Sequence, residues 1–235
     1  MASQSIVTRK DYEDYLLLLY FGRSENHLES CQDRAYRDFS RTLHGLRSVE
    51  TGSVLYLQAR AALGQSLRSL ASTNSVMQEQ FDNWHEKTCE QLAEIYNQHS
   101  HRLFVGQAQK WINMTFKYVF TFGEERLPGF THLYPYCHVP LDNIFIDYLR
   151  PYNSPKLSTR WSRLTHYDEY LQFQYWIRRH FTPLPLDTEF MMWLGRTPSF
   201  TQLDSYLALK TAQQGQPNTA LQPTPLAGRS RSGRF

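Results

Sequence analysis

Apolar residues recur at steps of three and four through the first hundred positions, which is the spacing of one buried face of an α-helix. The first predicted helix covers 12–21, because Thr8 and Asp11 before it are spaced as in a capping box and Gly22 follows it. The same period continues in three further segments, at 28–46, 55–70 and 77–95. Because short loops join these segments, four antiparallel helices are predicted to form a bundle over 1–101.

The second half of the chain mixes helical segments with longer irregular ones. A helix over 105–122 ends near Gly123, and the Pro- and aromatic-rich segment 124–139 that follows is too long for a simple connector. Three shorter helices are then predicted, at 141–149, from Thr165 to about His180, and over 183–195. We therefore expect an all-α, two-lobed helical bundle with a central buried helix. Its predicted parts are a lobe over 1–101, a lobe over 102–212 and a disordered basic tail over 213–235.

Composition narrows the class of protein. With 41% hydrophobic and 14% aromatic residues, the 235-residue chain is globular rather than disordered. No apolar run could span a bilayer and the N-terminus lacks a signal-peptide pattern, so we expect a cytoplasmic protein without a membrane partner.

The three cysteines are scattered along the chain, at Cys31, Cys89 and Cys137, which predicts neither a disulfide framework nor a zinc site. A formal charge of +3 permits DNA or another polyanion as partner. No Gly-rich phosphate loop is present, and no cofactor is predicted.

The predicted helix 105–122 carries polar side chains in an otherwise apolar sequence. Gln107, Lys110, Asn113 and Lys117 fall at steps of three or four, which predicts a narrow polar stripe on a mostly buried helix. One interpretation is that the stripe is the solvent-facing edge of the helix. The other is that it lines a cleft. Because the stripe has two lysines, two amides and no carboxylate, such a cleft would suit an anionic ligand.

The residues after this helix supply a second candidate. In His138-Val-Pro-Leu-Asp142 a proline stands where a helix can begin, and the aspartate is placed to cap its first turn. Together with Val105-Gly106 and Lys110, the Pro140-Leu-Asp142 sequence resembles the helix-hairpin-helix DNA glycosylases. In that family a hairpin ending in glycine precedes a cleft lysine, and a Pro-x-Asp sequence follows. Phe104 stands here where the hairpin usually has its first glycine.

The resemblance implies an enzyme that acts on an extruded base. Lys110 would be the amine nucleophile at the sugar C1′, and Asp142 would stabilise charge on the sugar or position an attacking group. Lys117 is the alternative cleft lysine. The residues expected to contact nucleic acid are Gln107, Trp111, Asn113, Lys117 and His138. The candidates for an aromatic pocket around the base are Trp111, Tyr134, Tyr136 and Trp161.

Two other patterns suggest different chemistry. Arg37 and His44 fit the spacing of the HEPN ribonucleases and would share one helix face, binding the scissile phosphate and handling the 2′-hydroxyl proton. His99 and His101 could suggest a metal site, but residues two apart point to different sides of a helix. No metal site is predicted.

The tail sequence PNTALQPTPLAGRS resembles the tails of proteins encoded in mobile gene cassettes of bacteria, which implies an accessory protein. The leading hypothesis is therefore a nucleic-acid-directed bacterial protein of the DNA glycosylase/lyase type. The alternatives are a non-catalytic helical interaction module, whose polar stripe is a partner surface, and a HEPN-like ribonuclease.

Overall fold

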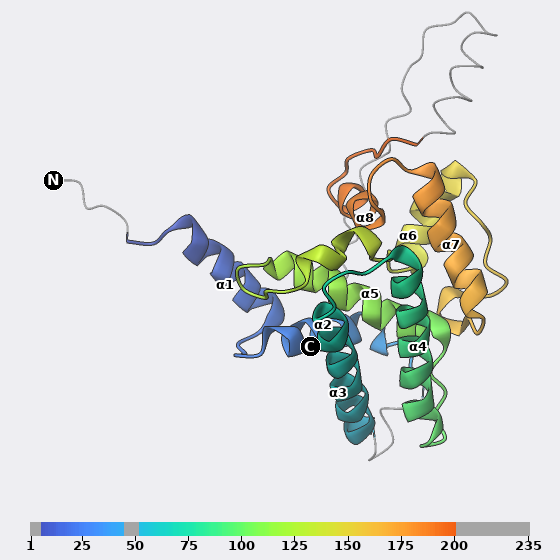
Figure 1. Cartoon of the computed structure of the whole chain (residues 1–235), viewed down its shortest axis with the longest axis horizontal. Coiled ribbons are helices and arrows are strands. Elements are labelled where there is room, and N and C mark those ends of the chain that lie inside the picture. The colour runs from blue at the N-terminus through green and yellow to red at the C-terminus, as the bar shows by residue number, and fades with distance from the viewer. Residues whose placement is uncertain (1–5, 45–51, 201–235) are drawn as a thin grey trace, which may run out of the picture.

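The computed structural model describes residues 6–44 and 52–200, and within these ranges the chain is helical (Figure 1). Apart from an isolated bridge between Phe181 and Phe200, the described ranges contain no β-structure. The predicted all-α fold is confirmed, whereas the predicted tail 213–235 lies outside the described residues. The α-helices are α1 (Arg9–Phe21), α2 (His27–Ser40), α3 (Gly52–Ala71), α4 (Gln78–Asn97), α5 (Val105–Phe122), α6 (Asn143–Leu149), α7 (Tyr167–His180) and α8 (Pro185–Trp193). Three short 3-10 helices accompany them: η2 (Thr131–Tyr136), η3 (Arg150–Tyr152) and η4 (Trp161–Arg163).

Helix α5 is the centre of the molecule (Figure 1). Of its 18 residues, all except Val105, Phe120 and Thr121 are buried. It packs most extensively against α2 and also contacts α4 and η4, while α3 and α4 form a helical hairpin. The prediction of a central buried helix is confirmed.

One hydrophobic core joins the two halves of the chain. Phe39 of α2, Trp111 of α5 and Phe173 of α7 all belong to the same cluster of buried side chains. The predicted boundary between residues 101 and 102 therefore runs beside a shared core, and the division into two lobes stays a prediction.

Several helix ends follow from local sequence. The capping box of α1 is formed, because Thr8 Oγ1 accepts from the Asp11 amide at 3.3 Å and Asp11 Oδ2 accepts from the Thr8 amide at 2.7 Å. Gly22 and Gly123 follow α1 and α5 with φ of 82° and 78°, a left-handed region that favours glycine. These three predictions are confirmed.

Two predicted boundaries are wrong. Helix α2 ends at Ser40 instead of reaching residue 46. The cause is a turn in which Thr42 donates both its amide and its hydroxyl to the Phe39 carbonyl, each at 2.8 Å. The helix predicted to start at Thr165 begins two residues later, at Tyr167, with His166 as its N-cap residue.

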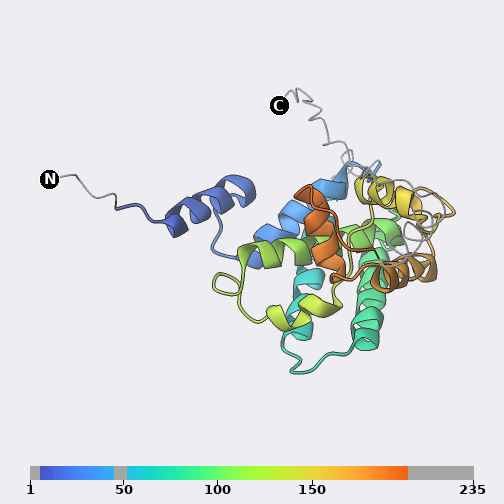
Figure 2. The same ribbon diagram turned by 90° about the horizontal axis from the view of Figure 1, so that it is seen from above.

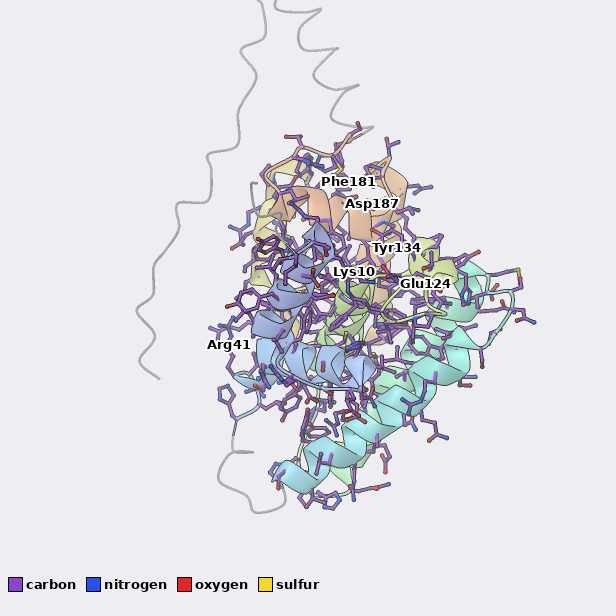
Figure 3. All side chains as sticks on the ribbon, turned by 90° about the vertical axis from the view of Figure 1, so that its left-hand side faces the viewer. Lys10, Arg41, Glu124, Tyr134, Phe181 and Asp187 are labelled. Atoms are coloured by element: carbon purple, nitrogen blue, oxygen red, sulfur yellow. The ribbon has the colours of Figure 1, made fainter. Side chains whose placement is uncertain are left out.

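The segment 124–139 is anchored to the rest of the fold. Tyr134 in η2 donates to Asp187 of α8 at 2.6 Å, while inside the segment the Glu124 carboxylate accepts from the Gly129 amide at 2.7 Å (Figure 3). The long segment predicted from the sequence is therefore packed against α8.

Candidate functional site

The side chains of Lys110 and Asp142 meet beside α5. Lys110 Nζ donates to Asp142 Oδ2 at 2.6 Å. Asp142 is also the N-cap residue of α6, where its Oδ1 accepts from the Phe145 amide at 2.9 Å. The side chains are 6% and 18% exposed, so this ion pair reaches solvent mainly from the carboxylate side. The residue that caps the helix thus also carries the negative half of a charged pair.

This pair lines a surface hollow of about 360 Å³ that is rich in cations. The positive side chains in its lining come from α2, from the residue that follows it and from α5, and they outnumber the two carboxylates, Asp38 and Asp142. Three aromatic side chains also line the hollow, where they can contact a flat ligand. The cations are Arg37, Arg41, Lys110 and Lys117, and the aromatic residues are Tyr20, Tyr118 and Trp193. Such a lining suits an anion with an aromatic part.

Lys117 also reaches the hollow but has a more deeply buried partner. Its Nζ lies 2.8 Å from Oε1 of Glu189 in α8, a side chain that is 3% exposed. Burial raises the pKa of Glu189, and Lys117 opposes this shift in part. The Glu189 Oε1 also accepts from Trp193 Nε1 at 3.3 Å. Glu189 was not predicted from the sequence, although an acid inside the apolar sequence PLPLDTEFMMWLG was a usable signal.

Four of the predicted nucleic-acid contacts lie elsewhere, in the core. Gln107 donates to the Thr42 carbonyl at 3.0 Å, and Trp111 Nε1 donates to the Gln32 carbonyl at 2.9 Å. Asn113 and His138 are completely buried. None of these four side chains lines the hollow. Of the predicted stripe, only Lys110 and Lys117 line it, so the prediction of a single stripe that also includes Gln107 and Asn113 is wrong. The physical reason is that long-range partners on different sides of α5 bind its polar side chains.

Asn113 and His138 belong to a buried hydrogen-bond chain between α4, α5 and α7. His138 Nε2 donates to Asp82 Oδ1 at 2.7 Å, and its Nδ1 accepts from the Tyr170 hydroxyl at 2.7 Å. Tyr170 in turn accepts from Asn113 Nδ2 at 2.7 Å, and Asn113 Oδ1 accepts from His85 Nε2 at 3.0 Å. In this arrangement His138 accepts at Nδ1 and donates at Nε2, which only a neutral imidazole can do.

The surroundings of this chain keep the histidines neutral. Burial lowers the pKa of His138 to about 4, although its hydrogen bond to Asp82 works in the opposite direction. Burial and the neighbouring His138 lower the pKa of His85 well below its usual value. Burial raises the pKa of Asp82, but His138 and Arg178 outweigh that effect and lower it. The buried chain ends on a charged Asp82–Arg178 pair.

Gly106, the glycine of the resemblance, has a packing role. Its amide donates to the Leu164 carbonyl at 3.2 Å, so this amide already has a hydrogen-bond acceptor within the protein. A Cβ at Gly106 would lie 1.5 Å from the Trp161 carbonyl oxygen. Glycine is therefore required where α5 crosses η4.

The other candidate residues are dispersed. Trp111, Tyr134, Tyr136 and Trp161 do not line the hollow. Arg37 does line it, but His44 lies beyond the end of α2, so the two residues of the HEPN pattern do not share a helix face. The sequence did not predict a role for Tyr20, Tyr118 or Trp193, because nothing in their local sequence distinguishes them from core aromatic residues.

Neither a metal-binding group nor a membrane-spanning helix is found in the described part of the chain. Residues 6–44 and 52–200 contain no group of three His, Cys, Asp or Glu side chains arranged to hold a metal ion. None of the helices in these ranges combines the length and apolar character needed to cross a bilayer.

Comparisons with protein-family models, with curated proteins and with solved structures give no match for this chain. The chemistry of its own residues is therefore what indicates a function.

Proposed function

We propose that the protein binds a nucleic-acid strand at the hollow and acts on an extruded nucleotide there, as a DNA glycosylase/lyase-type enzyme. The observation that carries the proposal is the 2.6 Å contact between Lys110 Nζ and Asp142 Oδ2 in a hollow lined by Arg37 and Arg41. The arginines suit the backbone phosphates, and Tyr20 or Trp193 can stack on a base. The resemblance of the tail to cassette-encoded proteins supports a bacterial accessory role, which would be exercised in the cytoplasm.

The ion pair gives the proposed reaction a proton path. Across the 2.6 Å contact the Lys110 ammonium transfers one proton to the Asp142 carboxylate and becomes a nucleophilic amine. Its lone pair forms a bond to C1′ while the bond from C1′ to the base breaks. The base leaves with that electron pair and takes the proton from Asp142. The nitrogen then loses one proton, and its lone pair opens the C1′–O4′ bond while O4′ takes up a proton, which leaves a protonated imine.

Borohydride trapping tests this reaction directly. The purified protein is incubated with an abasic-site duplex and reduced, which converts an imine into a stable covalent adduct. We expect an adduct with the native chain and none with Lys110→Arg, which keeps the positive charge but cannot form the imine. Asp142→Asn keeps the helix cap and should slow trapping by roughly 10²–10³-fold. Lys156→Ala, at an exposed lysine outside the hollow, is the matched control and should trap normally.

A second candidate, a non-catalytic nucleic-acid-binding module, is favoured by the double role of Asp142. Because this carboxylate already caps α6 and pairs with Lys110, the pair also contributes to the fold. No adduct, together with single-stranded DNA binding that Arg37→Ala and Arg41→Ala weaken and Arg68→Ala does not, would exclude the enzyme and support the module. Each arginine that no longer neutralises a phosphate should reduce the slope of log K against log salt concentration by about 0.7.

A further inference from the structure

Helix α1 is attached to the body of the protein by one side only. It projects from the rest of the fold (Figure 2). On the attached side Lys10 pairs with Glu125, Asp14 accepts from Arg126 Nε at 2.6 Å, and Phe21 packs against core aromatic rings. These contacts fix which side of α1 faces away.

The opposite side of α1 is an exposed apolar stripe. Tyr12, Tyr15, Leu16 and Leu19 are each between 57% and 63% exposed, and Ile6 just before the helix is 94% exposed. At 100° per residue the four helical positions span about 100°, the width of the stripe by which a helix normally packs on a core. The stripe contains no charged side chain. It is therefore an apolar packing face without a covering element in the described part of the chain.

The stripe is large enough for a stable interface. Taking about 200 Å² for a large side chain, the exposed fractions of these five residues correspond to roughly 700 Å². A standard interface buries about 600–1,000 Å² on each partner. Apolar patches of this size mark interaction sites on soluble proteins.

We propose that a second copy of this chain covers the stripe, so that two α1 helices pack face to face across a two-fold axis. A two-fold axis brings identical patches together, and an uncharged stripe can meet its copy without burying a charge. The flanks of α1 disfavour a lipid surface, because membrane-surface helices carry lysines and arginines there. Here Arg9 pairs with Glu13 at 3.0 Å, and Asp11 adds a further negative charge. This interface is separate from the proposed reaction at Lys110.

Light scattering on the full chain tests the proposal. The native protein should have twice the chain mass of 27.8 kDa at micromolar concentration. Leu16→Glu with Leu19→Glu should return it to the single-chain mass with unchanged helix content. The control is Leu57→Glu, at a half-exposed leucine of α3, which should stay dimeric. A native protein of single-chain mass, or stripe variants that remain dimeric, would overturn the proposal.

A cross-linking experiment locates the contact. The cysteines Cys31, Cys89 and Cys137 are buried, so an introduced surface thiol is the accessible one among the described residues. Leu16→Cys should give a covalent dimer with a short bis-maleimide, whereas Leu57→Cys should not. Flotation with anionic vesicles by a protein of single-chain mass would assign the stripe to lipid instead and contradict the proposal.

Discussion

Lys110 and Lys117 show how two similar residues acquire different roles. They lie seven residues apart on α5, so both point toward the same side of the helix. The partner of Lys110 is a partly exposed helix cap, whereas the partner of Lys117 is almost completely buried. Lys117 therefore serves mainly to compensate a buried carboxylate, and Lys110 is the lysine with the more accessible acid.

Removing the Lys117 charge should strongly destabilise the fold. Lys117→Met leaves Glu189 buried without its cation, which should lower the free energy of unfolding by about 3–5 kcal/mol. Urea denaturation measures the change. In the double variant Lys117→Met with Glu189→Gln, much of that stability should return, because no buried charge remains. A loss below about 1 kcal/mol in the single variant would contradict this assignment.

The sequence predicted that Lys110 and Asp142 are the reactive candidates, and the structure brings them together. It could not predict that Gln107 and Asn113 would turn away from the hollow. Their partners, Thr42 and His85, come from segments 65 and 28 residues away. Periodicity reports only which side of a helix a residue occupies, and it carries no information on what another helix presents there.

At the scale of elements, helices were predictable wherever a cap and a period coincided. Thr8, Asp11 and Gly22 define α1, and Gly123 ends α5. The end of α2 was predicted several residues too far, because Leu43 continues the apolar period while lying outside the helix. From the sequence alone, a buried apolar residue that follows a helix cannot be distinguished from a further turn of that helix.

The crossing of α5 and η4 gives a prediction for Gly106. Gly106→Ala should push α5 away from the backbone of Trp161 and lower the melting temperature markedly, because a carbonyl oxygen cannot move aside as a side chain does. The control is Gly64→Ala in α3, where the nearest atom is the flexible end of Gln32 at 3.3 Å. Thermal unfolding followed by circular dichroism compares the two. Equal melting temperatures for the two variants would show that the crossing tolerates a side chain.

At the scale of the whole molecule, the buried hydrogen-bond chain makes stability depend on pH. This chain runs from Asp82 through His138, Tyr170 and Asn113 to His85. The pKa of His138 is lowered to about 4, below the value of about 6.5 expected in the unfolded chain. Between pH 4 and pH 6.5 the unfolded state therefore binds more protons than the folded state. The contribution of neutral His138 to the free energy of unfolding is complete above pH 6.5 and is lost as the pH falls toward 4.

Denaturation at a series of pH values checks this linkage. The free energy of unfolding should decline by roughly 3 kcal/mol across that window from His138 alone. His85, whose pKa is also lowered, should steepen the decline. His138→Asn should be less stable at pH 7 and show a flatter profile. An unchanged slope in that variant would mean that other groups control the acid transition.

The burial of α5 also has a consequence during synthesis. Residues of α2 such as Leu28, Ala35 and Phe39 lie in the core, and α5 is the element that α2 contacts most. The ribosome makes α5 some 65 residues after α2, and at about 5–20 residues per second the growing chain spends several seconds without it. The face of α2 that packs on α5 therefore stays uncovered during that interval, and we expect a nascent-chain chaperone to bind there.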